Sequence, residues 1–412
     1  MTGGITLVDM LERHAGERPD KIAYIFGEEQ IDYRTLDRRS RKVAAGLVAA
    51  GAKCGDRIGY IGANSAAYYE ILFGVAHIGA VMMPMNWRLA DAELAYILAN
   101  GRCHILFAEP VYVDRLAEAG VALDLIVGLG GLGIADDYAI WRDGQQDRIA
   151  AAAIDPEQAV MQLYTSGTTG RPKGAMLSHR SILALRTDVP EEEQPVWNRW
   201  SEGDVSILPL PLFHIGTAAW GLIGSYYGAT SIIQPEFEAG ALIEAVERYG
   251  VTRLCMVPSA LKLMIEHPRA PTADFSSVAY TFYGASPIPL TLLRDAMRTL
   301  GCGFVQIYGM TETSGAILGL PPEDHAIEGN RRMLSAGKPY PGVELEIRDP
   351  DGNALPDGAI GEVTIRCGAT MIGYYGDDEA TAKAIDAAGW LRTGDAGFLK
   401  TAISSSTIGS RK

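Results

Sequence analysis

Short apolar segments alternate with helix-like segments along most of the 412-residue chain, and this alternation constrains the fold more than any other feature. "DRIGYIG" (56–62) predicts a buried strand, and "SAAYYEILFGVAHIG" (65–79) predicts a helix with Ser65 as its N-cap. A strand, "AVMMPMN", a helix, "DAELAYILANG", and a further strand, "CHILFAE", follow. Repeated strand–helix–strand units are typical of a parallel sheet covered by helices.

The same alternation returns between residues 204 and 309, where five predicted strands are separated by helical patterns. These strands are "VSILPLPLF", "TSIIQ", "TRLCMVP", "AYTFYG" and "FVQIYG". Beyond residue 337, apolar residues alternate around Asp-Gly turns, which predicts an antiparallel sheet or small barrel over about 337–395. The expected class is α/β, with two βα-layered subdomains, mostly parallel sheets and a small β-barrel-like subdomain. The acidic stretch 188–204 predicts a mobile loop.

Composition excludes several classes of protein. The chain has 36 Lys and Arg against 50 Asp and Glu, a net charge of −14, which argues against nucleic acid as the main partner. The five cysteines form no C-x-x-C pair, which favours a reducing compartment over a disulfide framework or a zinc site. The N-terminus turns polar too early for a signal peptide, and no apolar run reaches the ~18 residues of a spanning helix. We expect a cytoplasmic protein.

The segment "YTSGTTGRPKG" (164–174) is dense in glycine and hydroxyl residues and follows the predicted strand "AVMQLY". Small residues let a backbone approach a ligand closely and present N–H and O–H donors, and Lys173 adds a positive charge. A plain surface turn would explain the glycines but not the four hydroxyls and the lysine. The spacing is not that of a Walker A loop. The segment predicts a phosphate-binding loop.

Two later segments extend the predicted site. "QIYGMTET" (306–313) follows a predicted strand, at the sheet edge where open α/β sheets bind ligands. There Tyr308 is suited to stack on a base, Thr311 to donate to a phosphate, and Glu312 to bind Mg²⁺ together with phosphate oxygens. In isolation the segment is equally a capped helix start at Thr311. "GWLRTGD" ends in Asp395, which is suited to accept both hydroxyls of a ribose or to serve as a turn aspartate.

Taken in order, "YTSGTTGRPKGAMLSH", "LPLPLFHIG", "YGASPIP", "YGMTET" and "GWLRTGD" resemble the core motifs of the adenylate-forming superfamily. This superfamily includes acyl-CoA synthetases, luciferases and the adenylation domains of peptide synthetases. The resemblance extends from "DYRTLDRRSRKVAAGL" near Asp32 to Asp395. It implies ATP, Mg²⁺ and coenzyme A as reactants. A carboxylate attacks the α-phosphate of ATP, and a thiol then displaces AMP to form a thioester.

The resemblance also implies a role for each matching residue. A phosphate loop would surround the β- and γ-phosphates and the leaving pyrophosphate, and it consists of Thr165, Ser166, Gly167, Thr168, Thr169, Gly170 and Lys173. An adenine site would consist of Gly284, Ala285, Ser286, Tyr308, Gly309 and Met310. Thr311 would touch the α-phosphate, Glu312 would bind Mg²⁺, and Asp395 would hold the ribose. His214 would lie where the acid meets the thiol channel, although by itself it is equally a core or capping histidine. His179 matches a motif position and is expected to be structural.

The sequence constrains the identity of the substrate acid and the oligomeric state less than it constrains the reaction. "LPLFHIGT" and "YGASPIPL" resemble the corresponding segments of fatty-acyl and aryl-acid CoA synthetases more than those of amino-acid adenylation domains. A medium or long fatty acid is therefore the first expectation, and an aromatic acid is the second. A homodimer is conceivable.

Two alternatives belong to other classes of function. Gly128, Gly130 and Gly133 match the dinucleotide fingerprint G-x-G-x-x-G, which would indicate an oxidoreductase, but the following "IADDYAIWRDG" is a poor helix. A glycine-rich connection explains this segment better. The other alternative is a catalytically silent module that binds a nucleotide or an acyl-adenylate.

The last residues, "KTAISSSTIGSRK", match no hinge of the superfamily. With suitable codons, 402–412 read in a neighbouring frame as Gly-Tyr-Leu-Phe-Ile-His-Asp-Arg-Ile-Lys-Glu, which resembles that hinge. We therefore expect an N-terminal core over 1–395, an aberrant tail over 396–412 produced by a frameshift near Leu399, and no C-terminal domain with its catalytic lysine. Retained ligand binding with impaired adenylation and thioester formation would follow, since one lost charge-stabilising donor costs about 3–4 kcal/mol. Sequencing of the gene beyond the stop codon tests this expectation.

Overall fold

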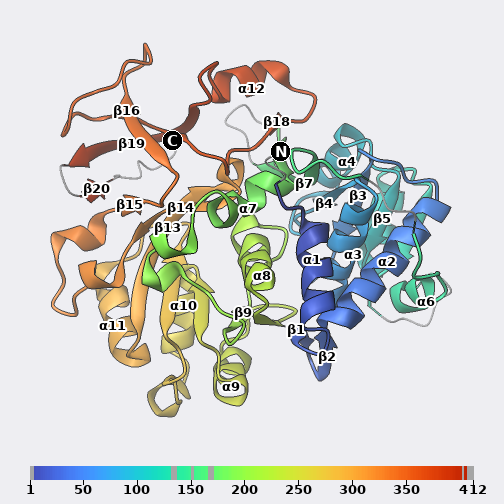
Figure 1. Cartoon of the computed structure of the whole chain (residues 1–412), viewed down its shortest axis with the longest axis horizontal. Coiled ribbons are helices and arrows are strands. Elements are labelled where there is room, and N and C mark those ends of the chain that lie inside the picture. The colour runs from blue at the N-terminus through green and yellow to red at the C-terminus, as the bar shows by residue number, and fades with distance from the viewer. Residues whose placement is uncertain (1–3, 131–136, 150–152, 166–170, 401–402, 406–412) are drawn as a thin grey trace.

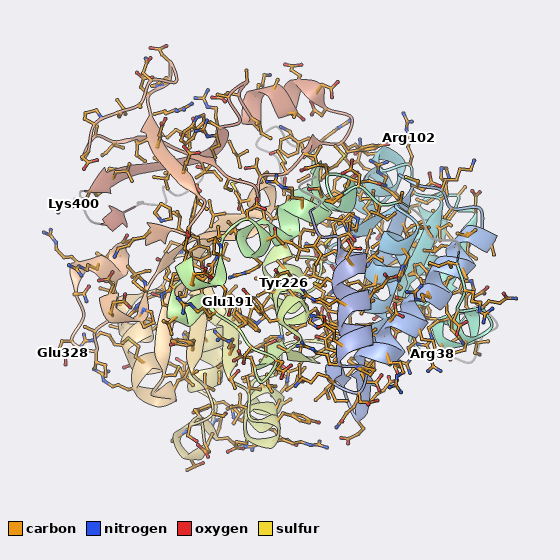
Figure 2. All side chains as sticks on the ribbon, in the orientation of Figure 1. Arg38, Arg102, Glu191, Tyr226, Glu328 and Lys400 are labelled. Atoms are coloured by element: carbon orange, nitrogen blue, oxygen red, sulfur yellow. The ribbon has the colours of Figure 1, made fainter. Side chains whose placement is uncertain are left out.

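Two large, mostly parallel sheets share one hydrophobic core (Figure 1). The computed structural model describes residues 4–130, 137–149, 153–165, 171–400 and 403–405. Within these residues the predicted α/β class with two mostly parallel sheets is confirmed. Charged side chains such as Arg38, Arg102 and Glu328 lie exposed at the edge of the molecule (Figure 2).

The first sheet has seven strands in the order β18-β8-β7-β4-β3-β5-β6. The pairs from β7 to β6 are parallel, whereas β7–β8 and β8–β18 are antiparallel. The strands are β3 (Arg57–Ile61), β4 (Val81–Pro84), β5 (Ile105–Ala108), β6 (Leu125–Gly128), β7 (Ala159–Thr165), β8 (Lys173–Ser178) and β18 (Gly373–Tyr374). The helices of this half are α2 (Tyr33–Ala49), α3 (Ala66–His77), α4 (Asp91–Asn100), α5 (Pro110–Glu118), α6 (Tyr138–Asp143) and α7 (His179–Thr187).

The second sheet has nine strands in the order β15-β14-β13-β12-β11-β9-β10-β1-β2. Its strands are β1 (Ile22–Phe26), β2 (Glu29–Asp32), β9 (Val205–Leu208), β10 (Thr230–Ile233), β11 (Arg253–Met256), β12 (Tyr280–Gly284), β13 (Gly303–Met310), β14 (Gly315–Leu320) and β15 (Lys338–Pro339). The helices of this half are α1 (Leu7–Glu17), α8 (Ile215–Tyr227), α9 (Ala239–Tyr249), α10 (Pro258–Ile265) and α11 (Leu290–Leu300). The 3₁₀ turns are η1 (Glu191–Glu193), η2 (Val196–Asn198), η3 (Ala270–Thr272), η4 (Thr311–Thr313), η5 (Pro322–Asp324) and η6 (Arg331–Leu334).

A third, antiparallel sheet lies above the two large sheets in Figure 1. It has the order β16-β17-β19-β20 and consists of β16 (Glu344–Arg348), β17 (Gly361–Arg366), β19 (Leu391–Lys400) and β20 (Ile403–Ser405), with α12 (Asp378–Ala384) before β19. Two short strands of the same region pair elsewhere, since β15 pairs with β14 and β18 with β8. The region is thereby tied to both large sheets.

Local chemistry explains where the predicted helices begin and end. Asp32 accepts a hydrogen bond from the Thr35 N–H at the start of α2. Ser65 is the N-cap of α3 as predicted, but its side chain makes no capping bond. Helix α8 ends at Gly228, whose φ of 73° is in the left-handed region that glycine enters at little cost.

The prediction of a mobile loop over 188–204 is wrong. The segment forms η1 and η2 and inserts Trp197 and Trp200 into the core, where they are 8% and 3% exposed. Trp200 packs edge-on against Trp220 of α8, with 4.7 Å between ring centroids. The acidic composition did not predict this burial, because Asp188, Glu191, Glu192, Glu193 and Glu202 stay exposed while the two tryptophans bury large apolar surfaces.

Candidate active site

The predicted phosphate loop connects two paired strands. Thr165 ends β7, Lys173 begins β8, and the two residues are direct partners across the antiparallel pair. Ser166, Gly167, Thr168, Thr169 and Gly170 lie outside the described residues. The Lys173 ammonium lies 5.2 Å from the ring centroid of Tyr374. Pairing of Thr165 with Lys173 therefore holds both ends of the loop together.

Glu312 lies beside this hairpin although it is distant in sequence. Its carboxylate is 6% exposed and accepts a hydrogen bond from the Tyr374 hydroxyl at 2.8 Å and a longer one from the Thr165 hydroxyl at 3.4 Å. Tyr374 reaches this position because β18 pairs with β8 and sets Tyr374 opposite Ala175. The structure thus brings together Thr165, Lys173 and Glu312, and it adds Tyr374, which sequence reasoning missed.

Glu312 fits the predicted Mg²⁺ site in one respect. Among the described residues it is a buried carboxylate with no ion-pair partner, and such a charge is costly unless a cation or hydrogen bonds compensate it. Within the same described part of the chain, no group of three or more His, Cys, Asp and Glu side chains could hold a metal. A single protein carboxylate that shares the ion with substrate phosphates suits Mg²⁺.

The nucleotide motifs on β13 and β19 meet directly. The Tyr308 hydroxyl donates to the Asp395 carboxylate at 2.6 Å, and Tyr308 is 7% exposed. The backbone N–H of Asp395 donates a hydrogen bond to the Thr393 hydroxyl at 3.1 Å. The predicted adenine and ribose residues are therefore neighbours.

A cavity of about 520 Å³ lies at the carboxyl ends of the parallel strands of the nine-stranded sheet. This is a size typical of small-molecule sites. The predicted residues that line it are Gly284, Ala285, Gly309, Met310, Thr311 and His214. Ser286, Tyr308 and Asp395 are not among the lining residues. The cavity continues past the nucleotide motifs into an apolar part formed by side chains such as Trp220, Phe237 and Leu263.

Strand packing requires glycine at two of the predicted site positions, Gly284 and Gly309. A Cβ atom on Gly284 would lie 2.2 Å from the Ile307 carbonyl oxygen, and one on Gly309 would lie 2.0 Å from the Gly315 carbonyl oxygen. Neighbouring strands therefore approach closely at both motifs. Ala285 follows with a φ of 65°, a conformation that costs a residue with a Cβ about 1–2 kcal/mol. Backbone strain of this kind is concentrated at functional sites.

His214 precedes α8 at the mouth of the cavity, next to a row of aromatic rings. Its ring lies 4.6 Å from that of Phe213, which packs edge-on against Trp87 at 6.4 Å, and the Arg88 guanidinium lies over the Trp87 ring. Partial desolvation, and then the positive charge of Arg88, lower the pKa of His214 below its usual value. His214 is therefore neutral at pH 7. By contrast His179 is fully buried and its Nδ1 accepts a hydrogen bond from the Leu7 N–H, a structural contact.

Sequence reasoning also missed two residues of the cavity wall. Asn64 follows β3, and its side chain donates to the Leu210 and Gln234 carbonyls and accepts from the Leu212 N–H. Trp220 lies on α8 between this cavity and a smaller one of about 60 Å³. No local sequence pattern identifies Asn64 or Trp220, because each reaches the cavity through elements that come together only in the folded chain.

Comparison with known proteins identifies the class. The family model described as AMP-binding enzyme matches residues 11–375, and the chain belongs to this family of adenylate-forming enzymes. The resemblance inferred from the motifs is thereby confirmed. The dinucleotide fingerprint gains no support, because Gly133 lies outside the described residues and α6, the next described helix, has only six residues.

Individual relatives align with most of the chain. A fatty acid–[acyl-carrier-protein] ligase, ScoC, from Streptomyces coeruleorubidus is 38% identical over 96% of this chain and 75% of its own length. An indoleacetate–CoA ligase from Aromatoleum aromaticum is 34% identical over 95% of this chain and 76% of its own. The crystal structure of the N-terminal domain of FACL13 from Mycobacterium tuberculosis has a TM-score of 0.87 and 25% identity, and covers 97% of this chain and 99% of that one. The first two of these relatives are ligases by name.

Within the described ranges, no helix is both long enough and apolar enough to cross a bilayer.

Proposed function

We propose that this chain is an acid–thiol ligase that activates a carboxylic acid with ATP. A carboxylate oxygen of the acid attacks the α-phosphorus of ATP, and pyrophosphate leaves with the bonding electron pair. The sulfur of a thiol then attacks the acyl carbon, loses its proton, and displaces AMP. The observation that carries this proposal is that one cavity is lined by Gly309, Met310 and Thr311 and also by His214 and many apolar side chains.

The residues of the hairpin and of η4 supply the charge stabilisation. We assign the β- and γ-phosphates and the leaving pyrophosphate to Thr165, Lys173 and the intervening 166–170, and the α-phosphate to Thr311. Donors fixed before the reaction stabilise developing charge without reorganisation. Glu312 would hold Mg²⁺, which offsets the negative charge of the phosphates when it is bound with ATP. Tyr308 and Asp395 would bind adenosine.

For the acid, we propose a fatty acid of medium or greater length. Among the described lining residues of the cavity, Glu236 is the only carboxylate that could pair with a substrate amine, and Arg88 is the only guanidinium. The relative with 38% identity is named a fatty acid ligase. A continuous apolar lining suits an alkyl chain, whose burial contributes about 0.8 kcal/mol per CH₂ group.

An aromatic acid is the second candidate, and Trp220 favours it. Its indole lies against the cavity, and its buried N–H has no hydrogen-bond partner among the described residues. A buried donor without a partner is costly, so an oxygen substituent on a bound aromatic acid would satisfy it. Relatives at 34% identity are named indoleacetate–CoA ligase and feruloyl-CoA synthase.

For the thiol we propose coenzyme A. A carrier-protein phosphopantetheine presents the same thiol chemistry and is the acceptor in the name of the most similar of the relatives described above. Thioester formation from a supplied acyl-adenylate, measured with coenzyme A and with a loaded carrier protein in parallel, separates the two acceptors.

Acid-dependent exchange of labelled pyrophosphate into ATP tests the activity and the acid class together. Saturated fatty acids of increasing length and a set of aromatic acids are compared at equal concentration. We expect the most exchange with a fatty acid. Exchange with aromatic acids alone would reassign the substrate, and exchange that does not depend on any added acid would contradict the proposed reaction.

A further inference from the structure

A second cavity, of about 430 Å³, opens in the other half of the molecule. It lies at the carboxyl ends of β3, β5 and β6, where Tyr60, Glu109 and Leu129 line it. In the sheet order, β4 and β5 flank β3 on opposite sides. The connections therefore diverge at this point, and such a switch point is where open α/β sheets bind ligands. The glycine-rich segment that follows β6 reaches the same cavity through Gly130.

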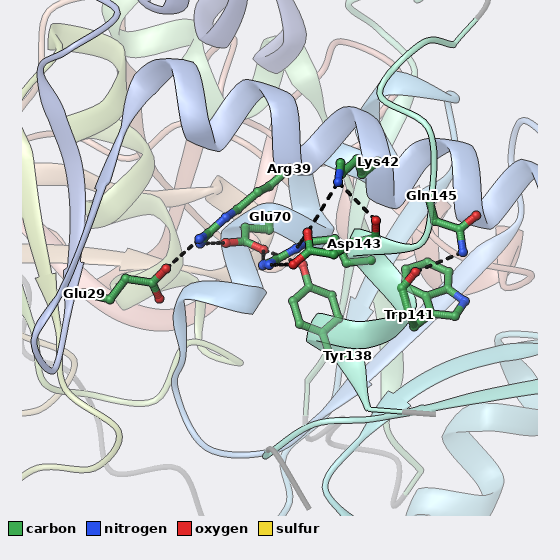
Figure 3. Close-up of polar contacts among 9 residues, drawn as sticks. Glu29, Arg39, Lys42, Glu70, Tyr138, Trp141, Asp143 and Gln145 are labelled. Atoms are coloured by element: carbon green, nitrogen blue, oxygen red, sulfur yellow. Dashed lines mark hydrogen bonds and ion pairs between the residues drawn. The ribbon is translucent and has the colours of Figure 1, made fainter. Parts of the chain in front are cut away.

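One wall of this cavity is a buried ion-pair network centred on Glu70 of α3 (Figure 3). The Glu70 carboxylate, 1% exposed, accepts hydrogen bonds from Arg39 at 2.9 Å, from Arg142 at 2.8 Å and from the Tyr138 hydroxyl at 2.7 Å. The outer nitrogens of the two arginines bind other carboxylates, Glu29 and Asp143. Both guanidiniums of the lining are thus neutralised by the protein itself.

The lining holds two further carboxylates, and each stands at the N-cap of a helix, Glu109 before α5 and Asp137 before α6. Glu109 accepts a hydrogen bond from the Ala63 N–H at 2.8 Å, and Asp137, 7% exposed, accepts one from the Ala139 N–H at 3.0 Å. Neither belongs to an ion pair among the described residues. The described lining holds four carboxylates, Glu29, Glu70, Glu109 and Asp137, against two guanidiniums, Arg39 and Arg142, so its net charge is negative.

Aromatic rings complete the lining. Phe26, Tyr60 and Tyr138 border the same space as Glu109 and Asp137. An electronegative pocket with aromatic walls suits a cation, because ring faces attract positive charge and a carboxylate forms its strongest hydrogen bonds with charged donors.

We propose that this cavity is a binding site for a small organic cation, an ammonium or guanidinium group on an apolar body. The site is separate from the adenylation cavity. Among the described residues, the two linings share Asn64 and Pro235, and the Asn64 side chain is hydrogen-bonded to the backbone of 210, 212 and 234. Binding of a cation in this second cavity does not depend on the proposed acid–thiol ligase activity.

Benzylamine and benzyl alcohol test the charge preference, because they have the same shape and differ in charge at pH 7.5. Calorimetric titration of the whole chain is expected to give benzylamine an affinity at least tenfold higher, and saturating AMP is expected to leave that affinity unchanged. Glu109→Gln and Asp137→Asn keep the acceptor oxygens that bind Ala63 and Ala139. Each is expected to weaken benzylamine about tenfold, the scale of one hydrogen bond to a charged group.

Glu118→Gln is the matched control, because it removes the same charge from an exposed position on α5. It is expected to bind benzylamine like the unmodified chain. Helix α3 begins at this cavity, and helix N-termini favour anions, so phenylmethanesulfonate is the opposing probe. Tighter binding of the sulfonate, an amine preference that survives both variants, or displacement of benzylamine by AMP would overturn the proposal. Loss of adenylation with intact benzylamine binding would instead count only against the proposed enzyme function.

Discussion

At the scale of single residues, Tyr374 links the two halves of the predicted phosphate site. Its hydroxyl donates to Glu312, while its ring lies beside the Lys173 ammonium. One side chain therefore positions both the carboxylate assigned to Mg²⁺ and the lysine assigned to the phosphates.

Tyr374→Phe keeps the ring and removes only the donor to Glu312. A hydrogen bond to a charged group contributes about 1.5–3 kcal/mol, so we expect at least a tenfold rise in the Mg²⁺ concentration needed for half-maximal ATP binding. Affinity for AMP without metal is expected to stay unchanged. Calorimetric titrations at a series of Mg²⁺ concentrations measure both quantities.

Tyr375→Phe is the control for that experiment. Tyr375 is the next residue, but its ring lies against the Arg57 guanidinium, with 3.7 Å between the guanidinium carbon and the ring centroid. An equal loss of Mg²⁺ sensitivity in both variants would count against a specific role for the Tyr374 hydroxyl.

At the scale of elements, the close approach of β13 and β14 sets the position of the nucleotide motif. Gly309→Ala places a methyl group against the Gly315 backbone, and overpacking of this kind costs about 1–3 kcal/mol. We expect a lower urea midpoint and weaker AMP binding together. Gly16→Ala is the matched control, since its site in α1 is open, and there alanine is expected to be neutral or mildly stabilising. Equal effects of the two substitutions would contradict the packing argument.

Helix α8 sets the depth of the acid pocket through Trp220, which separates the large cavity from the smaller one behind it. Trp220→Leu joins the two spaces, so the ratio of affinities for long over short acids is expected to rise severalfold, in line with about 0.8 kcal/mol for each further CH₂ group buried. Competition against a fluorescent acid measures this ratio. Trp390→Leu removes an equally buried indole that is not among the lining residues of either cavity, and it is expected to leave the ratio unchanged.

The sequence predicted helices and strands correctly where they depend on residues close together in the chain. The strands on either side of "TSGTTGRPKG" and the N-cap Ser65 follow from hydrophobic runs and turn residues in the chain itself. The contact of Tyr374 with Glu312 does not, because it needs β18 to pair with β8 almost two hundred residues earlier. The burial of Trp197 and Trp200 was not predicted for a related reason. An acidic composition does not show which apolar side chains of a segment pack into the core.

At the scale of the whole molecule, buried histidines couple stability to pH. Burial lowers the pKa of His77 to about 3 and that of His179 to about 4, from an ordinary value of 6.5. Below pH 6.5 the unfolded chain therefore binds protons that the folded chain does not, and stability falls as the pH falls from 6.5 towards 4. Each histidine contributes up to ~1.4 kcal/mol per pH unit in that window.

Urea midpoints at pH 7.5, 6.0 and 5.0 measure this dependence. We expect a progressive fall, and a shallower one in His77→Gln, which removes one titrating group. A midpoint that is constant over this range would contradict the assignment of both rings as neutral and buried.

The central claim is that one cavity holds the nucleotide and the acid side by side. A non-hydrolysable acyl-sulfamoyl adenosine, which joins the two as a mimic of the acyl-adenylate, tests it by calorimetric titration. We expect this compound to bind at least a hundredfold more tightly than AMP or the free acid, since one molecule then makes the contacts of both. An affinity no better than that of AMP alone would contradict it.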